Sequence, residues 1–380
     1  MALNDTPTTT TGVVGPFYVH IDDIDIVEDQ SKVTTGFFTG NVGTLAGSNL
    51  TTASLSTAQK KYYYNLQYSS ADQLSVAFGH LGGSGSIGSD GKLDNLQGET
   101  EAVYKYFANM TMDDDFSKQG FVFSSGSDGI SVEASKKADG ERGEPGMYFI
   151  VAERNRMKDR INKGTWTLQL GGSTTAGASI STLNLTDDSD YTDGGATSTV
   201  AGPRYNIVSG SAGNRNSKTP VHGYFYPNLG LWAMRESTLS ASAPGTPEAG
   251  VLDTTLGLNA ESGGLAANLN IGGKANTNAI KLVNSLRLGT HTIRSEEDQT
   301  TTSYFCRARA TQFNATNNPT WLSGSSGRLA NLKMEGGLET FMTTVGLYDS
   351  SYKLVAVGRL SKPIKKTFKT ESTVKVNLTF

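Results

Sequence analysis

Cysteine is almost absent from this chain, and that absence excludes a whole class of folds. Cys306 is the single cysteine among 380 residues, so no disulfide can form within the chain. A disulfide-stapled scaffold is therefore excluded, and a reducing cytoplasm is the expected folding compartment. Cys306 lies in an alternating run between Phe305 and Arg307, which predicts a small buried apolar residue rather than a nucleophile.

Charged residues, prolines and long apolar runs are also scarce. Charged residues make up 18% of the chain and the net charge is −3, which argues against a nucleic-acid coat, because such a coat needs a basic surface. No run approaches the ~18 apolar residues of a membrane span, and the polar residues 1–12 resemble no signal peptide. We therefore expect neither a membrane partner nor direct nucleic-acid binding.

Short strand-like runs separated by Gly, Ser, Asn and Asp are what the chain does have. They predict a mainly β protein with two or more sandwich-like or barrel-like domains and a few short helices. Helices are expected at 99–110 and 277–288, each with one apolar stripe. The first stripe consists of Val103, Tyr106, Phe107 and Met110, and the second of Ala279, Leu282, Val283 and Leu286.

Changes in composition along the chain predict four parts. Residues 1–15 read as an N-terminal arm, and residues 16–235 as a β-rich domain. Residues 236–275, rich in small and polar residues and without aromatics, read as a low-complexity insertion or linker. Residues 276–380 read as a C-terminal β-rich domain.

The end of the chain has the clearest strand pattern. Val374, Val376, Leu378 and Phe380 alternate with Thr373, Lys375, Asn377 and Thr379. A period of two places the first set on one face of a strand and the second set on the other. Phe380 is therefore predicted to be an anchored end and is a candidate interface residue.

Four lysines cluster around Pro363 just before this strand: Lys362, Lys365, Lys366 and Lys369. One interpretation is a solvated strand edge, since Lys and Pro protect edges from unwanted pairing. The other is an electrostatic contact with an acidic neighbouring subunit, or with this chain's own acidic N-terminal region. Both interpretations stay open at this point, and the four lysines join Phe380 as candidate interface residues.

Patterns that carry catalytic or cofactor chemistry are missing. The sequence contains neither H-E-x-x-H nor G-x-S-x-G. Residues 83–88 match G-x-G-x-x-G, but turn-like residues follow where a dinucleotide site needs a helix. Three acidic clusters, at residues 22–25 (Asp22, Asp23 and Asp25), 113–115 and 187–190, fit no EF-hand loop and predict solvated turns or helix caps. We expect no enzyme activity, no cofactor and no metal.

Several longer strings of residues carry a family resemblance. They are 75–80 leading into 83–86, 154–160, 205–211, 226–230, 304–319 and 343–366. The pattern resembles virion structural proteins of contractile-tailed bacteriophages of the T4-like, cyanophage and marine type. The last strands are similar to the ends of baseplate wedge proteins.

This resemblance implies a structural subunit of the phage tail, in the baseplate (wedge) region, that folds in the host cytoplasm and resides in the virion. Its partners would be other phage structural proteins and further copies in a symmetric assembly, through residues 1–15, 237–275 and the lysine-rich hairpin. Neck, collar or capsid-decoration positions are alternatives. A receptor- or glycan-binding adhesin is another, with Tyr224, Tyr226 and Trp232 as a sugar platform, although core packing is the favoured interpretation of these aromatic residues.

Overall fold

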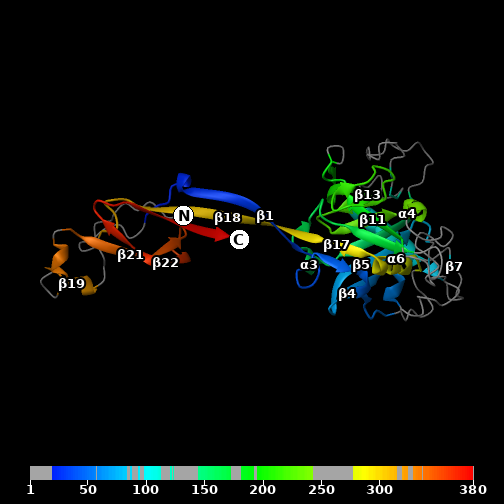
Figure 1. Cartoon of the computed structure of the whole chain (residues 1–380), viewed down its shortest axis with the longest axis horizontal. Helices are drawn as coiled ribbons and strands as arrows, with labels where there is room; N and C mark the ends of the chain where they lie inside the picture. Colours follow the sequence, from blue (N-terminus) through cyan, green and yellow to red (C-terminus); the bar gives the residue numbers. More distant parts are fainter. Residues whose placement is uncertain are drawn as a thin grey trace. The chain divides into compact units, whose positions relative to one another are not determined.

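A computed structural model of the chain (Figure 1) confirms a mainly β fold. The described residues are 19–56, 58–83, 86–87, 93–94, 98–112, 120–121, 123, 144–172, 181–191, 195–242, 277–314, 319–323, 328–335 and 337–379. Strands dominate them, and their helices are four short α-helices and a few 3-10 turns. The predicted arm 1–15 and residues 243–275 of the predicted linker lie outside the described residues.

The chain divides into two units. The central unit is Val33–Glu297, and the terminal unit combines Met1–Lys32 with Asp298–Phe380. Both ends of the chain contribute to the terminal unit because β1 (Ile26–Gly36) pairs with β18 (Arg294–Ala308). Sequence composition placed a boundary at 236–275, whereas this division falls within the two paired strands.

The central unit is built on one 11-stranded sheet with the path β10-β11-β13-β15-β16-β8-β5-β4-β3, from which β12 and β14 branch at β13. Its strands are β3 (Thr51–Thr52), β4 (Tyr64–Tyr68), β5 (Ala71–His80), β8 (Gly146–Ala152), β10 (Leu168–Gly172), β11 (Ser181–Asp187), β12 (Thr197–Thr199), β13 (Gly202–Ser211), β14 (Asn214–Arg215), β15 (Gly223–Tyr226) and β16 (Leu231–Arg235). Shorter pairs are β2 (Thr44–Ala46) with β17 (Thr290–Thr292), and β6 (Ser86–Ile87) with β7 (Leu93–Asp94).

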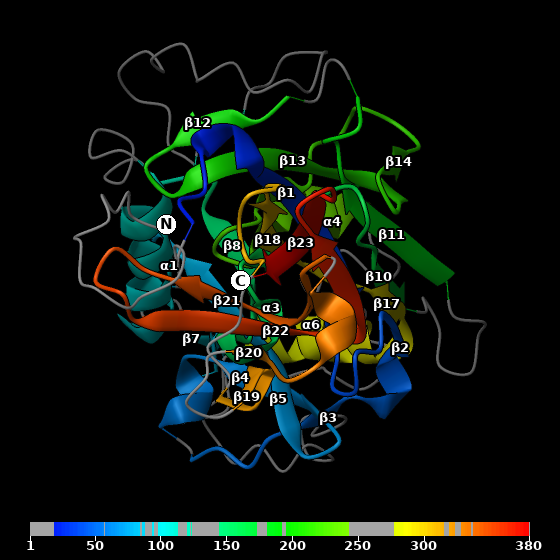
Figure 2. The ribbon, with the colours of Figure 1, turned by 90° about the vertical axis from the view of Figure 1, so that its left-hand side faces the viewer.

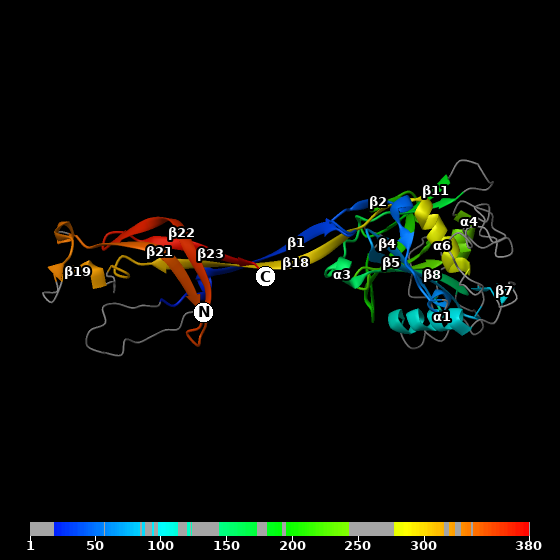
Figure 3. The same ribbon diagram turned by 90° about the horizontal axis from the view of Figure 1, so that it is seen from below.

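One helix covers each face of this sheet. Helices α1 (Gly98–Thr111) and α6 (Thr277–Leu288) lie on opposite sides of β5 and β8, as Figure 3 shows. Tyr148 and Ile150 of β8 point into the α6 core, and Met147 and Phe149 point into the α1 core. The central strands are therefore apolar on both faces, which is typical of strands buried on both sides.

The two predicted helices occur, with one error in the predicted stripes. In α6 the four expected residues are all buried. In α1, Tyr106 is 64% exposed and Tyr104 is buried in its place. The close approach of the helix to Gly79 explains the shift, since a Cβ on Gly79 would lie 2.7 Å from the Tyr104 nitrogen. The Tyr104 hydroxyl also donates to the Glu144 carbonyl at 2.6 Å and accepts from the Phe121 N–H at 2.8 Å.

The terminal unit consists of a sheet and a separate hairpin. In the sheet, β18 pairs with β1 on one side and with β23 (Ser372–Thr379) on the other. The hairpin is β21 (Glu339–Tyr348) with β22 (Leu354–Thr367), which run side by side in Figure 2. Among the described strands, β21 and β22 pair only with each other.

The remaining elements are short. Strands β19 (Leu322–Ser323) and β20 (Arg328–Leu329) form a small ladder, and β9 (Arg160–Ile161) pairs with the beginning of β18. The other two α-helices are α3 (Arg154–Met157) and α4 (Glu236–Ser242). In the part of the chain that the structure describes, no helix has the length and apolar character needed to cross a membrane.

Candidate functional site

Three of the four candidate lysines present their ammonium groups to solvent on the β22 side of the terminal unit. Lys362 and Lys365 lie on β22, and Lys369 follows it. Lys365 forms an ion pair with Glu339 on the paired strand β21. We call Lys362, Lys365 and Lys369 the basic set. Their exposure is compatible with both interpretations of the lysine cluster.

Lys366 is placed differently, with its side chain fully buried in its own chain. Its Nζ donates to the carbonyls of Thr367 and Ala310 at 2.9 and 3.0 Å, and to Oδ1 of Asn314 at 3.1 Å. Loss of solvation lowers the pKa of this ammonium, and Glu371 acts in the opposite direction. Consecutive residues of a strand point to opposite faces, so Lys365 and Lys366 separate. Lys366 fastens β22 to residues 310–314.

The terminal strand β23 has the predicted alternation. Val374, Val376 and Leu378 are shielded more than their neighbours Thr373 and Lys375, yet they are only half-buried. Phe380, the remaining candidate residue, lies outside the described residues. The apolar face of β23 is therefore real but incompletely covered by the chain itself.

An apolar surface outside the candidate residues of the sequence lies on the β21–β22 hairpin. Leu354, Val355 and Val357 of β22 are 52%, 62% and 60% exposed. Val357 stands opposite Gly346 of β21, and a Cβ on Gly346 would meet the side chains of Tyr348 and Leu354 at 3.0 and 3.2 Å. These side chains therefore gather over Gly346 on one face. We call Leu354, Val355 and Val357 the outer patch.

The terminal unit contrasts sharply with the central unit in apolar burial. Both apolar cores belong to the central unit. Among the described residues, the buried apolar side chains of the terminal unit are only Ala308 and Leu347. Of the thirteen exposed large apolar side chains in the part of the chain that the structure describes, ten belong to this unit, including Phe341 and Phe368. The terminal unit thus leaves in solvent the kind of surface that folding normally removes.

Acidic side chains gather at the other end of the same unit's sequence. Asp22, Asp23, Glu28 and Asp29 are exposed, and we call them the acidic set. Asp25 is instead buried and forms an ion pair with Arg307 of β18 at 2.7 Å. The prediction of solvated turns therefore fits Asp22 and Asp23 but is wrong for Asp25. The terminal unit consequently carries exposed groups of both signs.

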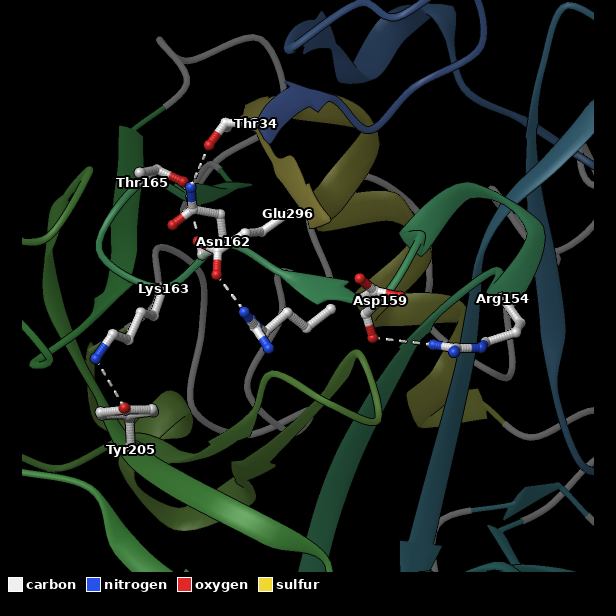
Figure 4. A network of polar contacts seen from close by, with 9 residues as sticks. Thr34, Arg154, Asp159, Asn162, Lys163, Thr165, Tyr205 and Glu296 are labelled. Atoms are coloured by element: carbon white, nitrogen blue, oxygen red, sulfur yellow. Dashed lines mark hydrogen bonds and ion pairs between the residues drawn. The ribbon is translucent and has the colours of Figure 1, made fainter. Parts of the chain in front are cut away.

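Residues 154–165 of the central unit hold the beginning of β18 and the end of β1 (Figure 4). Arg160 Nε donates to Glu296 Oε1 at 2.7 Å, and Asn162 Nδ2 donates to Thr34 Oγ1 at 2.9 Å. Lys163 Nζ extends the network to the Tyr205 hydroxyl on β13 at 3.1 Å. This segment, which includes the string 154–160 of the family resemblance, is a structural clamp that ties two strands to the large sheet.

A second group of titratable side chains lies beside α4 and α6 in the central unit. Glu144 accepts hydrogen bonds from Arg235 Nε at 3.2 Å and from the Ser237 N–H at 3.1 Å. Burial, with Glu144 nearby, raises the pKa of Glu236 to about 7. Burial also lowers the pKa of Lys281 to about 8, against the attraction of Glu236. The groups cross-link α4, β16 and α6, which is a structural role.

The aromatic residues considered for a sugar platform form no such surface. Tyr224 and Tyr226 are buried in the core under α1, and Trp232 is buried in the core under α6. Stacking of Trp232 on Phe225, with 5.3 Å between ring centroids, supports the core packing. Any glycan surface would have to use other residues.

Cys306 and the acidic cluster after β11 also lie in surroundings that are typical of a structural role. Cys306 is half-buried opposite Val374, and burial raises the pKa of its thiol, which disfavours the reactive thiolate. Asp187 is buried and accepts the Gly164 N–H at 2.9 Å, so the prediction of a solvated turn is wrong for this residue. In the described part of the chain, no group of three or more His, Cys, Asp or Glu side chains could hold a metal ion.

No protein-family model matches this chain, and the searches of curated proteins and of solved structures returned no match. A function for this chain therefore has to be inferred from its residues and their geometry. The outer patch, the basic set and the acidic set of the terminal unit are the surfaces that matter most for it.

Proposed function

We propose that this chain is a structural subunit of a bacteriophage contractile tail, in the baseplate (wedge) region, that acts through protein–protein contacts and performs no catalysis. The central unit would supply a stable body, since its sheet is covered on both faces. The terminal unit would supply the contacts with neighbouring subunits. In the virion, the partners would be other tail proteins and further copies of this chain.

One observation carries the assembly role: the terminal unit exposes large apolar side chains and buries almost none among its described residues. A monomer gains nothing from leaving such a surface in water, whereas a subunit of an assembly buries it against a neighbour. The placement in a phage tail rests, in addition, on the resemblance of residues 60–366 to virion structural proteins. The geometry favours an assembly role of this kind over a glycan-binding module, because the proposed aromatic platform is buried.

A neck, collar or capsid-decoration position is the second candidate, and the same exposed surface favours it equally. Symmetry separates the two candidates. A wedge component occurs in six or twelve copies around the tail axis, while a capsid decoration follows icosahedral symmetry.

A reconstruction of the phage particle that encodes this chain tests the proposal. We expect density for the chain at the baseplate with sixfold or twelvefold multiplicity. Density at the neck or on the capsid would instead support the second candidate, a neck, collar or capsid-decoration position. Absence of the chain from purified particles, checked by mass spectrometry of the same sample, would overturn a virion role.

A further inference from the structure

We propose that the outer patch is covered by a second copy of this chain, so that the terminal unit is a self-association module. This inference rests on the proposed assembly function and names the partner that this function needs. Four features of the described part of the terminal unit lead to it: the two-sided apolar character of β22, a hairpin to which no other described strand is bonded, the scarcity of buried apolar side chains and the opposite charges.

Strand β22 is apolar on both faces over residues 354–358 and again at Leu360. Such a nearly continuous apolar run is typical of a strand that is covered on both sides. In this chain only one side is covered: Ala356 stands opposite the buried Leu347, while Val355 and Val357 are exposed. The second side is therefore built for burial but has no cover among the described residues.

The hairpin also offers backbone groups for pairing. Strands β21 and β22 form a two-stranded ladder, and no other described strand is bonded to either of them. Their outer edges present N–H and C=O groups beside the outer patch, which together suit an added strand or a packed hairpin. Lys362 and Pro363 protect one end of β22 and leave the apolar end open.

The charges of the terminal unit identify the partner as another copy. The basic set and the acidic set both belong to this unit, and both are exposed. Complementary patches steer association and fix its register, and a chain that carries both can use each copy's acidic set against the next copy's basic set. Contacts of this kind are heterologous, and they close into rings when the rotation between copies permits.

The test compares two valine variants of the full chain by light scattering after size exclusion over a range of concentrations. Val357→Asp places a charge in the outer patch, and Val200→Asp is the matched control, because Val200 is 69% exposed in the central unit. We expect wild type and the control to self-associate, and Val357→Asp to weaken association by about tenfold or more, since loss of a buried apolar anchor costs at least that factor. Circular dichroism of each variant checks that the fold is retained.

A charge swap adds a readout that a purely structural role would not give. Reversing Lys362 and Lys369 to Glu should weaken association, as should reversing Asp22 and Asp23 to Lys. Combining both reversals in one chain should restore association, because opposite charges again face each other. Two results would contradict this pairing of the outer patch with the two charged sets. One is that the combined reversal restores association while Val357→Asp leaves association unchanged. The other is that Val357→Asp weakens association while the combined reversal fails to restore it.

A wild-type chain that stays monomeric at every concentration overturns the inference. In that case, deletion of residues 1–18 shows whether this chain's own N-terminal segment covers the outer patch, since the deletion would then produce self-association. The test of this inference can fail independently of the proposed function. If the chain is monomeric in solution but present in the baseplate, the proposed function stands and this inference is wrong. If the chain self-associates but is absent from phage particles, this inference stands and the proposed function is wrong.

Discussion

At the scale of single residues, Lys366 shows how far neighbouring identical side chains can differ. Lys365 reaches solvent and Glu339, whereas Lys366 donates three hydrogen bonds inside its own chain. A buried ammonium is tolerated only when its donors are satisfied, and here all three are. Lys366 is therefore part of the fold of the hairpin, and the surface function falls to the other lysines.

The substitution Lys366→Met should loosen the hairpin while preserving side-chain length. It leaves the Ala310 carbonyl and the Asn314 Oδ1 atom without this donor, which costs about 1–3 kcal/mol. Hydrogen exchange of the β21 and β22 amides should accelerate accordingly. The exposed Lys362→Met is the matched control and should change exchange by less than about 0.5 kcal/mol. Equal behaviour of the two variants would show that the Lys366 contacts contribute nothing.

Glu236 predicts a pH dependence of stability in the central unit. Its folded pKa of about 7 lies above the ordinary value of 4.5, so the folded state binds the proton more tightly. The resulting stabilisation is complete below pH 4.5 and is lost as the pH rises through about 7, by up to about 3 kcal/mol. Glu236→Gln should flatten this part of the profile in urea unfolding measured from pH 4 to 8.

The control for that profile is Glu335→Gln, which removes an exposed carboxyl of the terminal unit. Lys281 acts in a different window: with its pKa lowered to about 8 from 10.5, it should make stability rise between these two pH values. A wild-type profile that is flat between pH 4.5 and 7 would contradict the assignment to Glu236.

At the scale of elements, the clamp of residues 154–165 stabilises the N-terminal end of β18. Backbone pairing of β9 with β18 joins Arg160 to Glu296 and Ile161 to Ser295. Two ion pairs accompany the pairing, Arg160 with Glu296 and Lys158 with Glu297, at 2.7 and 2.6 Å. The first is well shielded from solvent and the second is exposed, so the two differ in energetic weight.

Neutralising the two glutamates separates these contributions. Glu296→Gln should destabilise the β9–β18 pairing by about 1–2 kcal/mol, because a charge-assisted hydrogen bond is weakened in a shielded place. Glu297→Gln, the adjacent control, should cost no more than about 0.5 kcal/mol. Hydrogen exchange of the Asn162 amide, which donates to the Arg294 carbonyl of β18 at 2.8 Å, measures both. A larger effect from Glu297→Gln would mean that the exposed ion pair outweighs the shielded one.

Elements with a strong local pattern were predictable from the sequence. The α6 stripe and the β23 alternation follow from periods of 3.6 and two, and both were correct. Tyr104 was missed because its burial depends on Gly79, a residue distant in sequence. The pairing of β1 with β18 was missed for the same reason, since nothing local specifies a partner more than 250 positions away.

The candidate surface was predicted only in part. The lysine cluster lies on the hairpin that also carries the outer patch, but sequence alone could not tell that Lys366 turns inward. The outer patch had a signal, the nearly continuous apolar run of residues 354–360, which differs from the alternation expected of a half-buried strand. Whether such a run is covered by its own chain becomes evident only from the structure.

At the scale of the whole molecule, the two units have different roles: the central unit provides stability, and the terminal unit provides the proposed association. The central unit contains both apolar cores, and its boundaries at Val33 and Glu297 fall on paired strands. The terminal unit has no comparable core among its described residues. Excision of one unit should therefore have very different consequences from excision of the other.

The fragment 33–297 should fold by itself and remain monomeric. Calorimetry should show one cooperative transition, because the fragment keeps both cores. Light scattering should show a single chain at concentrations where the full chain associates, because the outer patch and both charged sets are gone. A fragment that unfolds without cooperativity, or one that associates like the full chain, would contradict this division of roles.

The two-sided apolar character of β22 has a thermal consequence. Burial of apolar surface near room temperature is driven by entropy and carries a negative change in heat capacity, so its strength declines on cooling. Contacts made through Leu354, Val355 and Val357 would consequently be weaker in the cold than at growth temperature. Chilled preparations would favour separated chains, and warming would return them to the assembled state, which makes temperature a reversible control over the association of this protein.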